Sequence, residues 1–300
     1  MAWHYEHLPG QNAESLAAWL SESTEIERFA LIDVQRLDAE QMQALDGNRW
    51  GVAVNLYGDL AGTGIAALGP RLLRLPSDEI PNMIQLALAT RAVSFLLGKC
   101  DQSTLSAHLQ SIREVELPDR TAALFRYQDI HVTSALFPVL PAADSGRCLG
   151  PLSAWGALDA CNTLHVIAAT SDKRVSGSLH FDQKTVEALD DSLFVHAAMA
   201  QANDVDSALL APYTECEAET LVRQRIEMAK KLGLEQRDDI ALYCVLSLQF
   251  PPGFEKEAPF AEALRFRERN KPSFGATLDE VPSEAWTRWD ERLKDSKEIE

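Results

Sequence analysis

A glycine-rich run and a lone serine are the first features of this 300-residue chain that could support catalysis. The run at residues 58–64 reads GDLAGTG, but it lacks the Lys-Ser/Thr pair with which a P-loop reaches phosphates. Ser153, in the stretch GPLSAWG, lacks the G-x-S-x-G elbow of an α/β-hydrolase nucleophile. We therefore predict a loop between strand and helix at 58–64 and a surface turn at Ser153.

Histidines and cysteines are the next candidates, either for acid–base chemistry or for metal binding. His108, His131 and His165 could meet Asp33 or Asp129 in a triad or metal cluster, but nothing in their spacing requires it. A histidine at the edge of a helix or strand is more often packed or solvated. The cysteines are odd in number, widely spaced and never arranged as C-x-x-C, which favours buried reduced thiols; they are Cys100, Cys148, Cys161, Cys216 and Cys244. We predict no catalytic group, no metal and no cofactor.

The segment FRYQD at residues 125–129 differs from these candidates because it places a cation and a carboxylate three residues apart. Arg126 and Asp129 lie where a strand ends and a helix can begin, with Phe125 and Tyr127 beside them. Asp129 can cap the helix while Arg126 pairs with it. We favour a structural ion pair, and contact with a partner is the alternative.

The elements that position this segment alternate between strands and helices. Short apolar or alternating runs bounded by Gly, Pro and Asp predict strands at residues 28–34, 50–57, 71–75, 92–97, 113–117, 121–127 and 163–169. Helical patterns lie at 38–45, 84–91 and 102–112, the last behind an Asp101 cap. The turn Leu117-Pro118-Asp119-Arg120 predicts a hairpin over 113–127.

Strand periodicity ends near a small, polar stretch at residues 171–178. Helix signals follow it: Asp182 as a cap, a Thr214-x-x-Glu217 capping box, an apolar helix at 238–249, a short helix at 259–268 and an amphipathic helix at 283–294. We predict two lobes. Residues 1–170 form an α/β (α+β) lobe with a mixed sheet flanked by helices, and residues 178–300 form an all-α lobe.

Charge and hydropathy exclude several classes of partner. The formal charge of −17 repels phosphate backbones, and no basic cluster offsets it, so we predict no nucleic-acid binding. No apolar run is long enough to cross a bilayer. The first twenty residues lack a basic start and carry His4, Glu6, His7 and Glu14, which argues against a signal peptide. A cytoplasmic location without membrane contact is expected.

A series of landmarks in order resembles the type VI secretion effector chaperones, an adaptor family whose shared domain carries the designation domain of unknown function 4123. FALID at 29–33 resembles its Y-A-L-[IL]-D strand, GPRLLRL at 69–75 its G-P-x-L-x-x-L, and His108-Leu109 its H-L-R helix end. FRYQD at 125–129 resembles F-R-[FY]-[YW]-D-P-R, and LGP at 149–151 with Trp155 resembles the closing F-G-P…W. The resemblance covers residues 29–156.

The chain also departs from the family pattern. Gln128 replaces an aromatic residue, Ile130 a proline, and His131 and Gln110 each an arginine. These changes put in doubt any role for a second arginine.

The resemblance implies a Gram-negative adaptor that binds the N-terminal region of a toxin, the effector, and loads it onto the spike protein VgrG without catalysis. An adaptor of this kind needs apolar contact surface, for which Phe137, Trp155 and the stripe Trp286-Trp289 are candidates. Core packing is the alternative for each of them. Two other functions stay open: an immunity-type or regulatory toxin-binding protein, and a small-molecule enzyme with its site in the first lobe.

Overall fold

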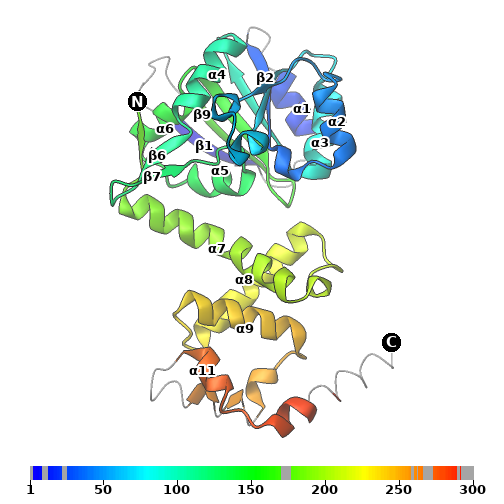
Figure 1. Cartoon of the computed structure of the whole chain (residues 1–300), viewed down its shortest axis with the longest axis vertical. Helices are drawn as coiled ribbons and strands as arrows, with labels where there is room; N and C mark the ends of the chain where they lie inside the picture. The colour runs from blue at the N-terminus through cyan, green and yellow to red at the C-terminus, as the bar shows by residue number, and fades with distance from the viewer. Residues whose placement is uncertain are drawn as a thin grey trace. The chain divides into compact units, whose positions relative to one another are not determined.

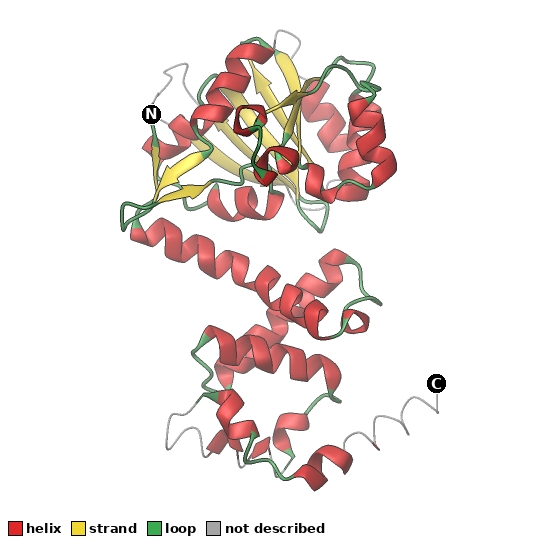
Figure 2. Cartoon of the chain, in the orientation of Figure 1, coloured by secondary structure: helices red, strands yellow, loops and turns green. Residues whose placement is uncertain are grey.

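The computed structural model describes residues 3–8, 13–21, 26–169, 177–257, 260–261, 263–265, 273–288 and 291. The chain divides into two compact units, residues 1–193 and 194–300 (Figure 1). The first unit is a sheet flanked by helices, and the second is helical (Figure 2). These are the two fold classes that the sequence predicts.

A seven-stranded sheet forms the centre of the first unit, with the strand order β1-β9-β8-β5-β2-β4-β3. Every pairing in it is antiparallel. The strands are β1 (Trp3–Leu8), β2 (Glu27–Ile32), β3 (Val54–Asn55), β4 (Arg71–Arg74), β5 (Val93–Gly98), β8 (Leu152–Leu158) and β9 (Leu164–Ala169).

Both faces of this sheet are covered, which explains why its central strands carry apolar residues on both sides. In β2, Phe29 and Leu31 face one hydrophobic cluster while Ala30 and Ile32 face the other, as alternation along a strand requires. Helices α1 (Ala13–Ser21), α2 (Ala39–Asp46) and α3 (Ile80–Thr90) contribute to the Ala30 side. Helices α4 (Gln102–Ser111), α5 (Ile130–Leu136) and α6 (Ala142–Leu149) contribute to the Phe29 side.

A second, three-stranded sheet has the order β10-β6-β7. Strands β6 (Glu114–Glu116) and β7 (Ala122–Leu124) form the predicted hairpin, although both strands are shorter than the pattern suggested. Strand β10 (Leu179–His180) pairs with β6 in parallel, so the mixed pairing lies in this small sheet.

The structure corrects the interpretation of Ser153 and adds elements that the patterns missed. Ser153 lies in β8, between β5 and β9, and not in a surface turn. The sequence LSAWGAL contains only one strong strand former, and its strand conformation depends on its neighbours. Strand β1 and helices α1 and α6 were also not predicted. The predicted junction at 171–178 lies mostly outside the described residues, and β10 follows it directly.

Helices make up the second unit, and the predicted end signals are in place. They are α7 (Gln183–Val205), whose first half belongs to the first unit, α8 (Glu215–Lys231), α9 (Arg237–Gln249) and α11 (Phe274–Leu278), with short helical pieces within 260–265 and 283–288. Asp182 accepts a hydrogen bond from the Thr185 amide, and Thr214 forms its capping box with Glu217. Short 3-10 helices complete the chain: η1 (Val34–Arg36), η2 (Gly58–Leu60), η3 (Gly64–Leu68), η4 (Ser207–Leu209) and η5 (Phe254–Lys256). Of these, η2 lies within the glycine-rich loop and η3 begins at its last glycine.

Candidate functional site

The first three residues of the FRYQD segment direct alternate side chains into the core and toward its surface. Phe125 and Tyr127 are 3% and 0% exposed, whereas the Arg126 side chain is 43% exposed. Phe125 contacts Tyr127 edge to face at 5.7 Å between ring centroids, and Tyr127 contacts Trp155 in the same way at 6.2 Å. The two aromatic residues of the segment therefore anchor it to the large sheet, and Arg126 is held above them.

Arg126 lies between two carboxylates that each cap a helix. Its Nη2 atom is 3.4 Å from Asp129 Oδ2 and 3.8 Å from Asp33 Oδ2. Asp129 accepts a hydrogen bond from the His131 amide at the start of α5, and Asp33 accepts one from the Gln35 amide at the start of η1. The ion pair expected from the spacing is present. Asp33, at the end of β2, is an additional partner that the spacing could not show.

Burial is the dominant influence on the pKa of Asp33. The residue is 1% exposed, and this burial raises the pKa of its carboxyl group above the ordinary value, although the Gln35 amide and the charge of Arg126 act in the opposite direction. Removing the cation would leave a buried acid with one amide donor. The arrangement ties the end of β2 to the start of α5 through two caps and an ion pair, which is the geometry of a structural junction.

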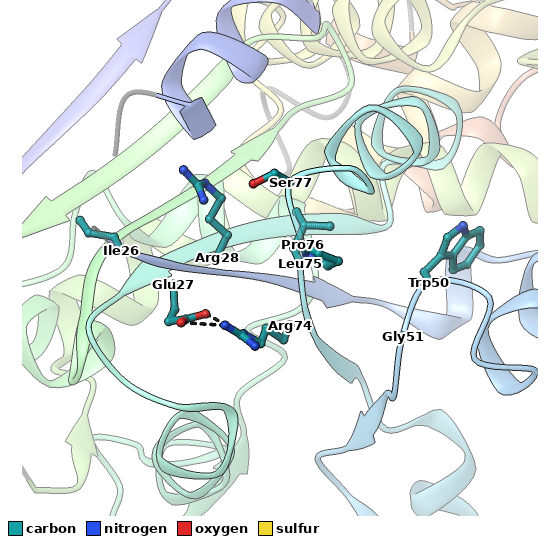
Figure 3. Close-up of a pocket in the computed structure, with 9 residues that line it drawn as sticks. All are labelled: Ile26, Glu27, Arg28, Trp50, Gly51, Arg74, Leu75, Pro76 and Ser77. Carbon is teal, nitrogen blue, oxygen red and sulfur yellow. Dashed lines mark hydrogen bonds and ion pairs between the residues drawn. The ribbon is translucent and has the colours of Figure 1, made fainter. Parts of the chain in front are cut away.

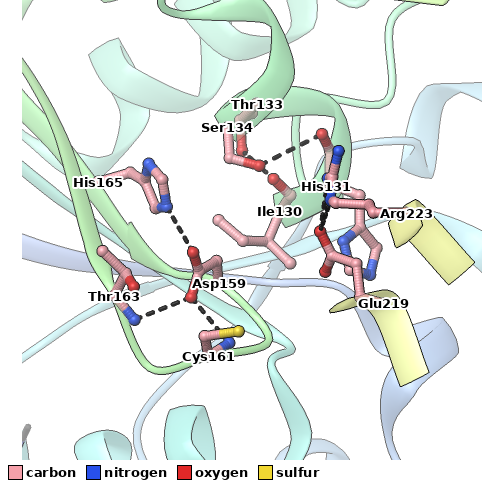
Figure 4. A network of polar contacts seen from close by, with 10 residues as sticks. All are labelled: Ile130, His131, Thr133, Ser134, Asp159, Cys161, Thr163, His165, Glu219 and Arg223. Carbon is pink, nitrogen blue, oxygen red and sulfur yellow. Dashed lines mark hydrogen bonds and ion pairs between the residues drawn. The ribbon is translucent and has the colours of Figure 1, made fainter. Parts of the chain in front are cut away.

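His131 stands where the family pattern has an arginine. Its Nε2 atom is 2.8 Å from Arg36 Nη2, and Figure 4 shows its backbone carbonyl accepting a hydrogen bond from Ser134. A guanidinium can only donate, so His131 Nε2 must be the unprotonated ring nitrogen in this contact. The second cation at this junction is thus Arg36, which comes from η1 and not from the FRYQD segment.

The predicted apolar contact residues lie in hydrophobic cores where the structure describes them. Trp155 and Phe137 are 0% and 2% exposed, and their rings meet edge to face at 5.6 Å. Trp286 is half-buried against Phe250 and Phe260. Core packing, the alternative reading, therefore applies to Trp155 and Phe137, and neither offers a surface. Trp289 lies outside the described residues.

Two landmarks of the resemblance that are forty residues apart meet in space. His108 Nε2 lies 3.0 Å from the carbonyl oxygen of Cys148, and the His108 ring lies against Gly150. Gly150 has φ +52° and ψ −113°. A Cβ atom built there would be 2.2 Å from His108 Cε1, so only glycine fits. Burial lowers the pKa of His108, and the hydrogen bond with the Cys148 carbonyl acts in the opposite direction.

The third histidine belongs to a hairpin turn. His165 Nε2 is 2.8 Å from Asp159 Oδ2, and Asp159 Oδ1 accepts the amides of Cys161 and Thr163 at 2.8 Å each (Figure 4). Burial acts to raise the pKa of Asp159, but these hydrogen bonds outweigh it and the pKa lies below its ordinary value. The dyad fixes the connection between β8 and β9.

The cysteines correct one expectation. Cys148 and Cys244 are buried free thiols whose pKa burial raises to about 12, and Cys100 is a half-buried thiol. Cys161 and Cys216 are each disulfide-bonded, and Cys161 is exposed, so the prediction of a buried reduced thiol is wrong for these two. Among the described residues, no group of three His, Cys, Asp or Glu side chains could hold a metal ion.

A shallow cavity of about 370 Å³ lies where β2 begins and β4 ends. Trp50, Leu75 and Pro76 line it, and Glu27 accepts two hydrogen bonds from Arg74, at 2.6 and 2.8 Å (Figure 3). Both side chains of this ion pair are well exposed, so the pair contributes little to stability. No described helix is long and apolar enough to cross a membrane.

Comparison with known families identifies the region that contains these junctions. Residues 28–147 match the model of a family described as Domain of unknown function (DUF4123). The match includes the whole FRYQD segment, the hairpin β6–β7 and His108. No curated protein and no solved structure matches the chain.

Proposed function

Because residues 28–147 are a domain of the DUF4123 family, which is associated with type VI secretion effector adaptors, we propose that the chain is such an adaptor. It binds the N-terminal region of a toxic effector in the cytoplasm and loads it onto the spike protein VgrG, without catalysis. The family match carries this proposal.

The geometry of the candidate site is compatible with a binding role. The polar clusters around Arg126, His108 and Asp159 each consist of helix caps, backbone hydrogen bonds or ion pairs that join elements of the first unit. They build a rigid scaffold on which a partner surface can be presented. The charge of −17 favours approach of basic partners and disfavours nucleic acid.

Affinity capture from the native strain tests the proposal. The tagged chain should retain one effector and the spike protein, both identified by mass, and loss of the chain should reduce secretion of that effector alone. Capture of neither protein would overturn the proposal.

The same strain separates the two alternatives. Protection of cells from the effector, with its secretion unchanged, would instead indicate an immunity protein. Turnover of a metabolite mixture by the purified chain would indicate an enzyme.

A further inference from the structure

Strand β7 is the outer strand of the small sheet and pairs on one side only, with β6, among the described residues. The Leu117 amide donates to the Thr121 carbonyl at 2.9 Å, and the Phe125 amide donates to the Arg113 carbonyl at 2.7 Å. In an antiparallel pair, every second residue directs its backbone groups to the partner strand. Ala122 and Leu124 therefore direct their N–H and C=O groups away from β6.

These outward groups are open for pairing. Within the described ranges, no hydrogen bond reaches the amide or carbonyl of Ala122 or Leu124. At the β3 edge of the large sheet, by contrast, the Gln102 side chain donates to the Val52 carbonyl beside the strand. The β7 edge thus has a row of backbone donors and acceptors that an added strand would satisfy.

The side chains of this edge define the kind of strand that fits. Leu124 is 44% exposed, and Ala122 is exposed as well. Their register partners on β6, Glu114 and Glu116, are exposed on the same face, and neither forms an ion pair in the described part of the chain. Val115, between them, is buried on the opposite face. An apolar edge is therefore bordered by two exposed carboxylates.

We propose that β7 is a docking edge at which an extended segment of the cargo adds as a fourth strand, with Lys or Arg alternating with apolar residues. Backbone hydrogen bonds to Ala122 and Leu124 hold the segment, and side chains select it. The cationic side chains of the segment lie across the small Ala122 side chain toward Glu114 and Glu116. The identity of the occupant as cargo rests on the proposed function.

The test uses a labelled nine-residue peptide of alternating Val and Lys, with fluorescence anisotropy as the readout. Its control is the same peptide with N-methyl groups on the backbone nitrogens that would face β7. Loss of two backbone hydrogen bonds is expected to weaken binding about tenfold or more. The double variant Glu114→Lys/Glu116→Lys is expected to weaken binding about two- to tenfold. The matched variant Asp204→Lys/Glu235→Lys changes net charge equally in the second unit and should bind as the wild type does.

The outcomes separate the edge from the function. Slower amide exchange at Ala122 and Leu124 on peptide binding, with Ala123 unchanged, supports the docking edge. Absence of peptide binding, or binding that N-methylation leaves unaltered, overturns it. In either case effector capture by the native chain decides the adaptor function independently. An effector that is captured equally well by the Glu114→Lys/Glu116→Lys variant would leave the adaptor function intact and refute this edge as its contact.

Discussion

Substitution of Gly150 by alanine should be among the most destabilising single changes in the first unit. The new Cβ would lie 2.2 Å from His108 Cε1 and 2.5 Å from both ring nitrogens. The alanine would also have to adopt φ +52° with ψ −113°, a combination that residues with a side chain rarely occupy. The backbone conformation costs about 1–3 kcal/mol. Displacing the packed ring costs about 1–3 kcal/mol more.

The total expected loss is therefore about 2–6 kcal/mol of the free energy of unfolding, which is a large part of the stability of a domain. Urea unfolding followed by far-UV circular dichroism measures it as a lower midpoint with an unchanged slope. Gly62→Ala is the matched control. Gly62 has φ +92° with nothing within 4 Å of an added Cβ, so this substitution introduces backbone strain alone.

A double-mutant cycle isolates the contact itself. His108→Ala removes the ring that Cβ would strike, so adding Gly150→Ala to that background should cost about 1–3 kcal/mol less than it does in the wild type. Equal losses for Gly150→Ala and Gly62→Ala, or strict additivity in the cycle, would refute the reasoning that His108 and Gly150 are locked together.

Four further predictions concern charge, domain organisation and cargo. Burial lowers the pKa of His108 below its unfolded value of 6.5, so the unfolded state binds the proton first as the pH drops. The free energy of unfolding should therefore fall as the pH drops through that value. A denaturation series from pH 8 to pH 5 should show a smaller fall for His108→Asn than for the wild type. Arg126→Ala should cost about 1–2 kcal/mol, since the half-exposed cation is screened but Asp33 is buried; the same loss when both carboxylates are already replaced by asparagine would contradict the pair. Limited proteolysis should cut first within 171–178. A chain that resists cleavage within 171–178 but is cut within 113–127 would contradict the predicted junction. Cargo affinity should fall slowly with salt because apolar and backbone contacts dominate it, with charge screened within about 8 Å; a steep fall with rising ionic strength would show that charge dominates.

Local signals in the sequence determined much of the architecture. The apolar runs that became β2 and β5, the Asp101 and Thr214 caps, and the turn that closes the β6–β7 hairpin all act over a few residues, so they can be identified without the rest of the chain. The i,i+3 spacing of Arg126 and Asp129 likewise sufficed to predict their ion pair. The ordered landmarks pointed to the family that residues 28–147 match.

Tertiary structure decided which side chains are accessible and which distant residues meet. The sequence left both surface contact and core packing open for Trp155 and Phe137. The placement of β8 between β5 and β9 decides for core packing, because both rings are enclosed there. The contacts of His108 with Gly150 and of Asp33 with Arg126 join segments about 40 and 90 residues apart. Such contacts are set by strand order and register, which depend on the packing of the whole sheet, and no local pattern encodes them.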